Sequence, residues 1–280
     1  MPELPEVETI VRSLHEGTRY GGLNVIGQQV CETTVLWERT LENISPDLFQ
    51  NKIAGQTVKD VYRRGKFLVF TLSSDTLLMH LRMSGDLRVE AGFWPDGSKV
   101  PLQPHDRLVL WFAGGLRMAF NNPRKFGRIW MMNDPQTVLG VLGPEPLDPA
   151  LTEGKFHAML QSHKRMLKPL LMDQHFLAGL GNIYTDEALF RARLHPRAIS
   201  NTLTAKQSAF LLVQIRTVLD EGIQRNGASI DWVYRGGDFQ NVFNVYGRDG
   251  EPCPRCGTEI ERTLVGQRGT HICPRCQRMQ

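Results

Sequence analysis

The first residues of the chain carry apolar side chains at the spacing of one helix face. These side chains follow the i, i+3, i+4, i+7 pattern of a buried stripe: Val7, Ile10, Val11 and Leu14. Pro5 suits a first helical turn, the glutamates Glu6 and Glu8 favour the positive end of the helix dipole, and Gly17 is a suitable stop. The pattern therefore predicts a short amphipathic helix that ends near Gly17.

Between Val58 and Met132 the pattern changes to short runs rich in β-forming residues. The links 73–75 and 113–115 are typical of hairpins, because they are short and consist of small or polar residues. The predicted strands are Phe67–Leu72, Thr76–Leu81, Leu108–Phe112, Leu116–Phe120 and Arg128–Met132. Several strands at this spacing, with almost no helix between them, indicate a β-sandwich or barrel.

A proline-rich segment at 142–149 separates this β-rich part from a helical part, because closely spaced prolines forbid regular structure. Beyond it, the longest predicted helix begins with a Thr204…Gln207 capping box and is followed by Gly227. Its apolar face consists of Leu211, Leu212, Ile215, Val218, Leu219 and Ile223. Shorter helical stretches are predicted at Phe156–Leu160 and Ile183–Ala192.

These changes of pattern predict the domain organisation. We expect an N-terminal β-rich domain over residues 1–140 and a linker over 141–149. A helical domain should follow over 150–245, and a cysteine-containing segment over 246–280.

Composition narrows the class of protein. The chain has 280 residues, of which 41% are hydrophobic and 22% charged, as in soluble globular proteins. It contains no run of about 18 apolar residues, and its acidic N-terminus is unlike a signal peptide, so we expect a cytoplasmic protein. The net charge of +4 permits nucleic-acid binding without requiring it.

Four of the five cysteines form two CxxC pairs: Cys253, Cys256, Cys273 and Cys276. Two such turns offer four thiolates to one ion, and the spacer between them is long enough for one β-hairpin. We therefore predict one structural Zn²⁺, whose binding energy is largely folding energy. Two disulfides or a redox CxxC are the alternatives. The fifth cysteine, Cys31, is expected to be a buried structural thiol.

Two further features carry possible chemistry. Pro2 becomes a free secondary amine if Met1 is removed, and such an amine can attack a sugar C1′ to form a charged iminium. The nearby Glu3 and Glu6 and the cation Lys66 could assist it, although a proline and glutamates are also ordinary in a first helical turn. Arg268, between glycines at the expected hairpin tip, suits a phosphate contact, although zinc ribbons are also common as purely structural caps.

Six motifs in order along the chain resemble those of the formamidopyrimidine-DNA glycosylases, bifunctional enzymes that excise oxidised purines. The motifs are Pro2–Thr9, Arg63–Leu68, His80–Gly85, Asn122–Gly127, Gly179–Tyr184 and Val245–Arg248, which leads into the cysteine segment. The resemblance implies an α+β fold of two domains. The first would be an N-terminal β-sandwich with an N-terminal helix, and the second a helix-two-turn-helix domain that ends in a zinc-ribbon β-hairpin.

The resemblance also implies roles for individual residues. Pro2 would be the Schiff-base nucleophile, Glu3 the general acid, Lys66 a proton-transfer and phosphate-contacting group, and Arg268 a phosphate ligand implicated in δ-elimination. Met83, Arg124 and Phe126 would wedge the duplex open, although core packing is the plain alternative for Met83 and Phe126. Asn182 and the cations His105, Lys125, Lys164 and Arg165 would contact DNA phosphates, with Glu6 and Glu187 as supports. The partner would be damaged double-stranded DNA, bound by a monomer without an organic cofactor.

Two departures from the family pattern affect these expectations. The segment 227–243 looks shorter than the usual base-capping loop, which weakens the expected preference for 8-oxoguanine. Asn122 replaces the more usual aspartate, which could change how the wedge loop is anchored. A preference for oxidised pyrimidines, or a non-catalytic protein that binds damaged DNA, are the alternative functions.

Overall fold

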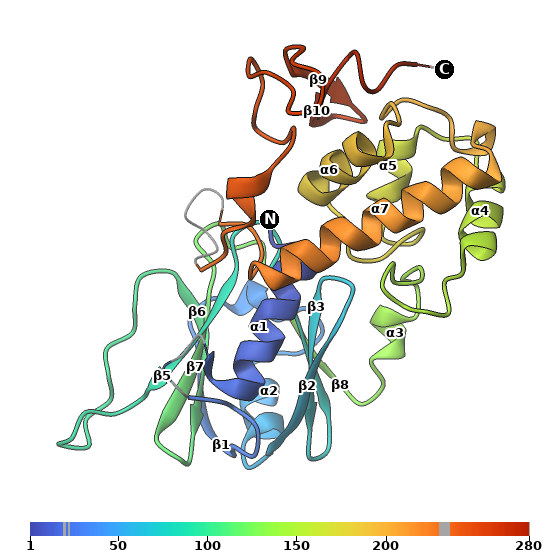
Figure 1. Cartoon of the computed structure of the whole chain (residues 1–280). Helices are drawn as coiled ribbons and strands as arrows, with labels where there is room; N and C mark the ends of the chain where they lie inside the picture. Colours follow the sequence, from blue (N-terminus) through green and yellow to red (C-terminus); the bar gives the residue numbers. More distant parts are fainter. Residues whose placement is uncertain (19–20, 22, 230–235, 280) are drawn as a thin grey trace. The chain divides into compact units, whose positions relative to one another are not determined.

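The computed structural model describes residues 1–18, 21, 23–229 and 236–279 (Figure 1). These described residues divide into two compact units. Unit 1 comprises Met1–Pro2, Glu6–Gly140 and Ser229–Gly237, and unit 2 comprises Glu3–Pro5, Val141–Ala228 and Asp238–Gln280. No helix within the described ranges is both long and apolar enough to cross a membrane.

Unit 1 contains two antiparallel sheets. The first has the strand order β1-β6-β7-β5 and the second β2-β3-β4-β8 among the described residues. The strands are β1 (Val30–Val35), β2 (Val58–Arg64), β3 (Phe67–Leu72), β4 (Thr76–His80), β5 (Asp86–Ala91), β6 (Asp106–Phe112), β7 (Leu116–Asn121) and β8 (Arg128–Met132). The predicted hairpins are confirmed, because β3 pairs with β4 and β6 with β7 across the two short links.

Helix α1 (Leu4–Glu16) supplies part of the core of unit 1. Its predicted apolar face is buried and packs in one cluster with side chains of both sheets, including Phe70 and Phe120. The helix ends as predicted, because Gly17 takes a positive φ of 72° and its N–H bonds to the carbonyl of Ser13 at 2.8 Å. Among its described residues, unit 1 also contains η2 (Glu38–Thr40), α2 (Pro46–Ile53) and α3 (Gln136–Leu139).

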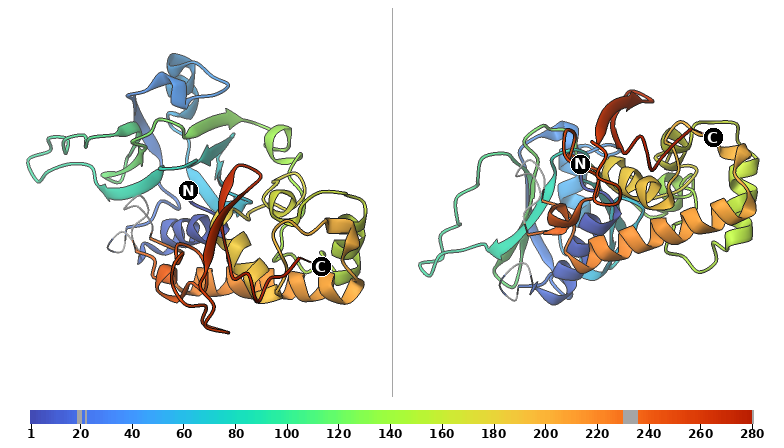
Figure 2. Two further views of the ribbon diagram at one scale, coloured as in Figure 1. Left: turned by 90° about the horizontal axis from the view of Figure 1, so that it is seen from above. Right: turned by 45° about the horizontal axis from the view of Figure 1, so that its top comes forward.

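Unit 2 is helical and ends in a β-hairpin. Its elements are α4 (Glu153–Gln161), α5 (Leu167–Leu171), α6 (Asn182–Ala192), η3 (Ser200–Thr202), α7 (Ala205–Gln224), η4 (Phe239–Val242), β9 (Glu261–Val265) and β10 (Arg268–Ile272). The long helix α7 begins with the predicted capping box of Thr204 and Gln207 and contacts α6 and α4 (Figures 1 and 2). The hairpin β9–β10 turns through Gly266 and Gln267, which both have positive φ, as a two-residue turn requires.

Cys31 is exposed, so the prediction of a buried thiol is wrong. Cys31 directly follows the buried Val30 in β1, so the alternation of side chains along the strand places Cys31 on the opposite, exposed face. The predicted base-capping segment 227–243 falls partly on residues 230–235, which lie outside the described residues. At its described ends, Ser229 Oγ donates to the Gly237 carbonyl at 2.8 Å.

Candidate active site and zinc site

Glu3 is fixed at the amino end of α6, within unit 2. Glu3 is 2% exposed, and its Oε1 accepts the N–H of Ile183 at 3.0 Å. A Cβ at Gly181 would collide with this carboxylate, so glycine is needed there for the close approach. Backbone N–H groups and the positive end of the helix dipole make such a terminus a natural place for a negative group. The predicted acid is therefore held by the glycine-rich turn that the sequence singled out.

The other two candidate residues near the N-terminus, Pro2 and Glu6, lie in unit 1. Pro2, which directly precedes Glu3, is buried, and Glu6 is 2% exposed in the first turn of α1. Met1 precedes Pro2 and is 50% exposed.

Lys66 lies in the tight turn between β2 and β3, also in unit 1. Gly65 takes a positive φ of 57° in this turn, and the Lys66 side chain is buried. Arg63 donates from Nη1 to the Gly65 carbonyl at 3.3 Å and from Nε to Glu8 at 3.0 Å, so it links the turn to α1. Burial alone would raise the pKa of Glu8. The hydrogen bonds and positive charges of Arg63 and Arg12 outweigh burial and lower the pKa of Glu8 below its ordinary value.

His80 is a residue to which the sequence assigned no role. It is buried at the end of β4, and its Nδ1 accepts the N–H of Arg82 at 3.0 Å. Burial, reinforced by the positive charges of Arg82 and Lys66, lowers the pKa of His80 to about 3. The imidazole is therefore neutral at physiological pH. The motif His80–Gly85 could have drawn attention to this histidine. Its burial could not be predicted, because it depends on how strand β4 pairs with other strands.

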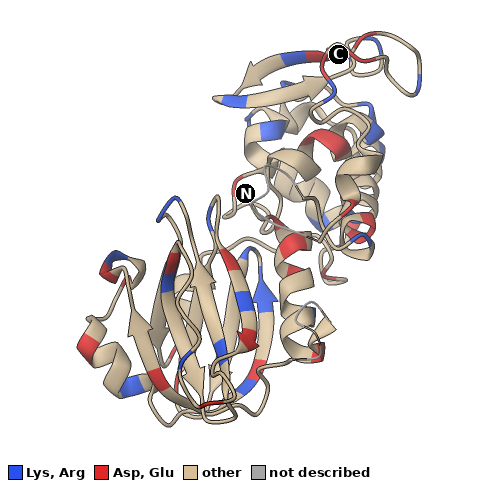
Figure 3. Ribbon diagram, turned by 90° about the vertical axis from the view of Figure 1, so that its left-hand side faces the viewer, with Lys and Arg blue, Asp and Glu red and all other residues tan. Residues whose placement is uncertain are grey.

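The three predicted wedge residues lie on two loops of unit 1 that come together. Arg124 Nη1 lies 3.9 Å from the sulfur of Met83, and the N–H of Arg124 bonds to Ser84 Oγ at 3.2 Å. Met83 is 42% exposed and Phe126 52% exposed, so core packing is ruled out for both. Figure 3 shows Lys and Arg at loop tips at one end of this unit's strands. The two loops therefore carry exposed apolar side chains beside a cation.

Two predicted phosphate contacts of unit 1 are exposed and have left-handed backbone. His105 has φ 72° and Lys125 φ 61°, and Arg82 shares this conformation at 55°. Lys125 Nζ lies 3.9 Å from the ring centroid of Trp37, a cation–π contact that the sequence did not predict.

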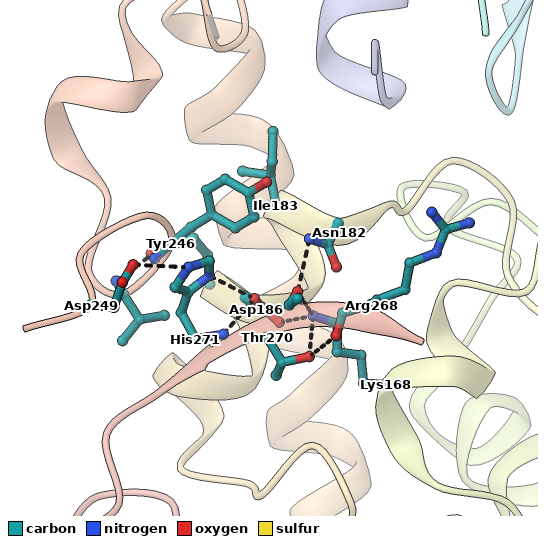
Figure 4. Close-up of polar contacts among 12 residues, drawn as sticks. Lys168, Asn182, Ile183, Asp186, Tyr246, Asp249, Arg268, Thr270 and His271 are labelled. Atoms are coloured by element: carbon teal, nitrogen blue, oxygen red, sulfur yellow. Dashed lines mark hydrogen bonds and ion pairs between the residues drawn. The ribbon is translucent and has the colours of Figure 1, made fainter. Parts of the chain in front are cut away.

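Unit 2 brings Asn182 and Arg268 onto one hydrogen-bonded network (Figure 4). Asn182 Nδ2 donates to the carbonyl of Gly269 at 3.0 Å, next to Arg268 at the exposed start of β10. Lys168 Nζ donates to the same carbonyl at 2.9 Å and to Thr270 Oγ1 at 2.8 Å. The β9–β10 hairpin and the turn before α6 are thus joined through one peptide group.

The network is centred on a fully buried ion pair that sequence reasoning missed. Lys168 Nζ lies 2.6 Å from Asp186 Oδ1, and both side chains are 0% exposed. Burial lowers the pKa of Lys168, and the charge of Asp186 opposes that shift. Asp186 Oδ2 also accepts the N–H of His271 at 3.0 Å. A lysine inside the apolar run Leu167–Leu171 was the available signal, but its acidic partner lies on another helix.

The remaining predicted residues of unit 2 fall into two groups. Glu187 is fully buried, and its carboxylate accepts the N–H groups of Asn244, Val245 and Tyr246 at 2.9–3.0 Å, so it fixes the turn that leads to the cysteine segment. Lys164 and Arg165 are exposed, and Arg165 forms an ion pair with Asp173.

The four predicted zinc ligands converge. Their sulfur atoms all lie within 4.8 Å of one another, with Cys253 and Cys276 4.0 Å apart and Cys256 and Cys273 3.5 Å apart. A tetrahedral ion with Zn–S bonds of about 2.3 Å requires sulfur atoms about 3.8 Å apart, so the four thiolates fit one Zn²⁺. N–H groups of Arg255 and Cys276 also point at cysteine sulfurs, at 3.4 Å. The site is a structural zinc site.

Family models match along most of the chain. The formamidopyrimidine-DNA glycosylase N-terminal domain matches residues 1–129 and the H2TH domain of the same enzymes matches residues 142–233. The zinc finger found in FPG and IleRS matches residues 250–278. Among curated proteins, the formamidopyrimidine-DNA glycosylase of Protochlamydia amoebophila is 40% identical over 99% of this chain and 100% of its own length. That of Herpetosiphon aurantiacus is 41% identical with the same coverage.

Solved structures agree with this match. Lactococcus lactis Fpg (MutM), bound to DNA containing N7-benzyl-Fapy-dG, is 34% identical with a TM-score of 0.88, covering 99% of this chain and 100% of that one. Thermus thermophilus MutM is 38% identical with a TM-score of 0.85, covering both chains completely. The predicted α+β fold, with its helix-two-turn-helix domain and zinc hairpin, is confirmed. This chain belongs to the formamidopyrimidine-DNA glycosylase family.

Proposed function

We propose that this chain excises oxidised purines, 8-oxoguanine and formamidopyrimidines, from duplex DNA and then cleaves the strand by β,δ-elimination. The observation that carries the proposal is the position of Glu3, held by the N–H of Ile183 and directly following Pro2. Relatives solved with DNA containing Fapy-dG, carbocyclic 8-oxo-G or an AP site support this substrate class.

Excision begins at the amine of Pro2 once Met1 has been removed. The nitrogen lone pair attacks C1′ and forms an N–C1′ bond, while the C1′–base bond breaks and the base leaves with the electron pair and takes up a proton. Glu3 donates a proton to the ring oxygen as the C1′–O4′ bond opens, and the nitrogen loses its own proton. The result is an iminium between Pro2 and the opened sugar.

Strand cleavage follows from this iminium. Loss of the C2′ proton expels the 3′ phosphate, and loss of the C4′ proton then expels the 5′ phosphate. Lys66 transfers protons in these steps, and Arg268 and Asn182 hold the phosphate at the lesion. Water finally hydrolyses the iminium and regenerates the amine. Glu6 and Glu187 support the amine and the turn after η4.

A base must be rotated out of the duplex before this chemistry, at a cost of a few kcal/mol. We assign Met83, Arg124 and Phe126 to fill the gap that the base leaves. His105, Lys125, Lys164 and Arg165 contact phosphates, so affinity should fall steeply with salt. The protein acts as a monomer, and its zinc stabilises the hairpin that carries Arg268. We further propose a cytoplasmic location at the nucleoid, and domain boundaries at 1–140, 150–245 and 246–280, with a linker at 141–149.

Borohydride trapping tests the central claim. Protein whose intact mass shows loss of Met1 should form a covalent complex with a duplex containing 8-oxoguanine in the presence of borohydride. Protein that retains Met1, and a Pro2→Gly variant, are the matched controls and should excise far less. Failure of the processed protein to trap would refute the mechanism.

Two further outcomes separate the alternatives. Binding to abasic duplex without any cleavage would indicate a non-catalytic damage-binding protein. Faster excision from thymine-glycol duplex than from 8-oxoguanine duplex would shift the substrates to oxidised pyrimidines.

A further inference from the structure

Asn122 occupies the centre of the loops that carry the proposed wedge. Its side chain is 0% exposed, and both ends of the amide are used. Nδ2 donates to the carbonyl of Leu81 at 3.3 Å, and Oδ1 accepts the N–H of Phe126 at 3.1 Å. One buried amide therefore links the loop that begins at Leu81 to the loop that contains Phe126.

The main chain of Asn122 adds a third segment. Its N–H donates to the carbonyl of His105 at 2.9 Å, and its carbonyl accepts Arg107 Nε at 2.9 Å and the N–H of Lys125 at 3.2 Å. All these segments belong to unit 1, and they carry the exposed cations and apolar tips described above.

Two glycines enclose the Asn122 amide, one from each wedge loop. A Cβ at Gly85 would lie 3.0 Å from Nδ2 and 2.5 Å from the carbonyl of Leu81. A Cβ at Gly127 would lie 2.5 Å from the same nitrogen. Real Cβ atoms do not approach so closely, so the amide and the two glycines form one packed unit with no room for a longer side chain.

The two hydrogen bonds of the Asn122 side chain need one group that donates and one group that accepts. An amide both donates and accepts, whereas an ionised carboxylate only accepts and would face the Leu81 carbonyl without a proton. Leaving a buried partner unsatisfied is costly, so the loops would move to avoid it. Ser84 provides a second link, because its Oγ accepts the N–H of Arg124.

We propose that Asn122 is a positioning residue that holds the two wedge loops in one arrangement and so sets how efficiently this protein everts a base from paired DNA. This inference rests on the proposed function. Because Asn122 acts through the wedge loops, its loss should slow the reaction on a duplex, where a stacked base must be displaced. Its loss should have little effect on a single strand, where no partner strand exists.

Two substrates separate these cases. The full-length zinc-loaded protein and its Asn122→Leu and Asn122→Ala variants are compared on 8-oxoguanine in a duplex and on an abasic site in a single strand. Both variants should lose about tenfold or more in kcat/KM on the duplex, as expected when a buried hydrogen bond of the wedge is lost. Cleavage of the single-stranded abasic site should stay within about twofold. Ser84→Ala should lose about threefold on the duplex and keep its fold, since it removes one hydroxyl.

Asn43→Ala is the matched control. The Asn43 amide also bonds to backbone at both ends, donating to the Met131 carbonyl and accepting the Met131 N–H, but on β8. It should lower the melting temperature without changing the ratio of the two activities.

Three results would overturn this proposal alone, and a fourth would overturn the proposed function as well. Duplex excision unchanged in both Asn122 variants and in Ser84→Ala would do so, as would equal loss on both substrates. Asn43→Ala changing the ratio as much as the Asn122 variants would show a general fold effect. Wild-type protein inactive on both substrates would overturn the proposed function itself, and this inference with it.

Discussion

Lys168→Met should destabilise unit 2 strongly, because it leaves a buried charge without its partner. Met keeps the length of the aliphatic stem but removes three contacts of the ammonium, to Asp186, the Gly269 carbonyl and Thr270 Oγ1. Removing one partner of a buried ion pair costs about 3–5 kcal/mol. For a unit of this size, each kcal/mol lowers the melting temperature by about 4 °C. We therefore expect a drop of about 12–20 °C in the transition of unit 2.

Calorimetry on the full zinc-loaded chain measures this drop. Lys155→Met is the matched control, because Lys155 is exposed on α4 and its Nζ bonds a single carbonyl, that of Ala150. Its effect should stay within about 0.5 kcal/mol. The double variant Lys168→Met/Asp186→Asn removes the orphaned charge while Asn keeps an acceptor for the N–H of His271, and it should recover much of the loss. A drop below about 4 °C for Lys168→Met would refute the reasoning.

Three other predictions concern pH, zinc and phosphate binding. Because the pKa of His80 in the folded protein is about 3, below its ordinary value of 6.5, the unfolded chain binds the extra proton first. Stability is therefore full above about pH 6.5 and falls by up to about 1.4 kcal/mol per pH unit down to about pH 3. The free energy of unfolding, measured with urea at pH 7 and pH 5, should fall less for His80→Gln than for the wild-type protein. An equal fall in the two proteins would contradict this prediction. Chelation of zinc should weaken DNA binding in gel shifts while circular dichroism keeps the β-signal of unit 1, and simultaneous loss of both would argue against separate roles. Arg268→Ala should reduce the δ-elimination product on gels and flatten the salt dependence of binding, and an unchanged product ratio would remove Arg268 from that step.

Sequence reasoning succeeded where the signal is local. The face of α1, the capping box of α7 and the hairpin links could be predicted because each is set by residues a few positions apart. The cysteine spacing was similarly informative, since two CxxC turns need one hairpin between them to meet.

The missed features depend on residues far apart in the chain. Lys168 and Asp186 lie on different helices, and the Asn122 amide bonds a carbonyl 41 positions earlier. Such pairings leave no periodic pattern in the sequence. Cys31 was misplaced because strand β1 was not predicted from the sequence, and within that strand Cys31 follows the buried Val30 and takes the opposite, exposed face.

The left-handed backbone at Arg82, His105 and Lys125 has a consequence for protein engineering. Glycine at any of these positions would relieve about 1 kcal/mol of strain and so raise heat resistance. Each replacement would also delete a side chain that can be positively charged from a surface proposed to meet DNA. A screen for thermal stability alone would thus enrich variants that bind DNA more weakly. Directed evolution of this protein therefore needs an assay of repair activity in every round.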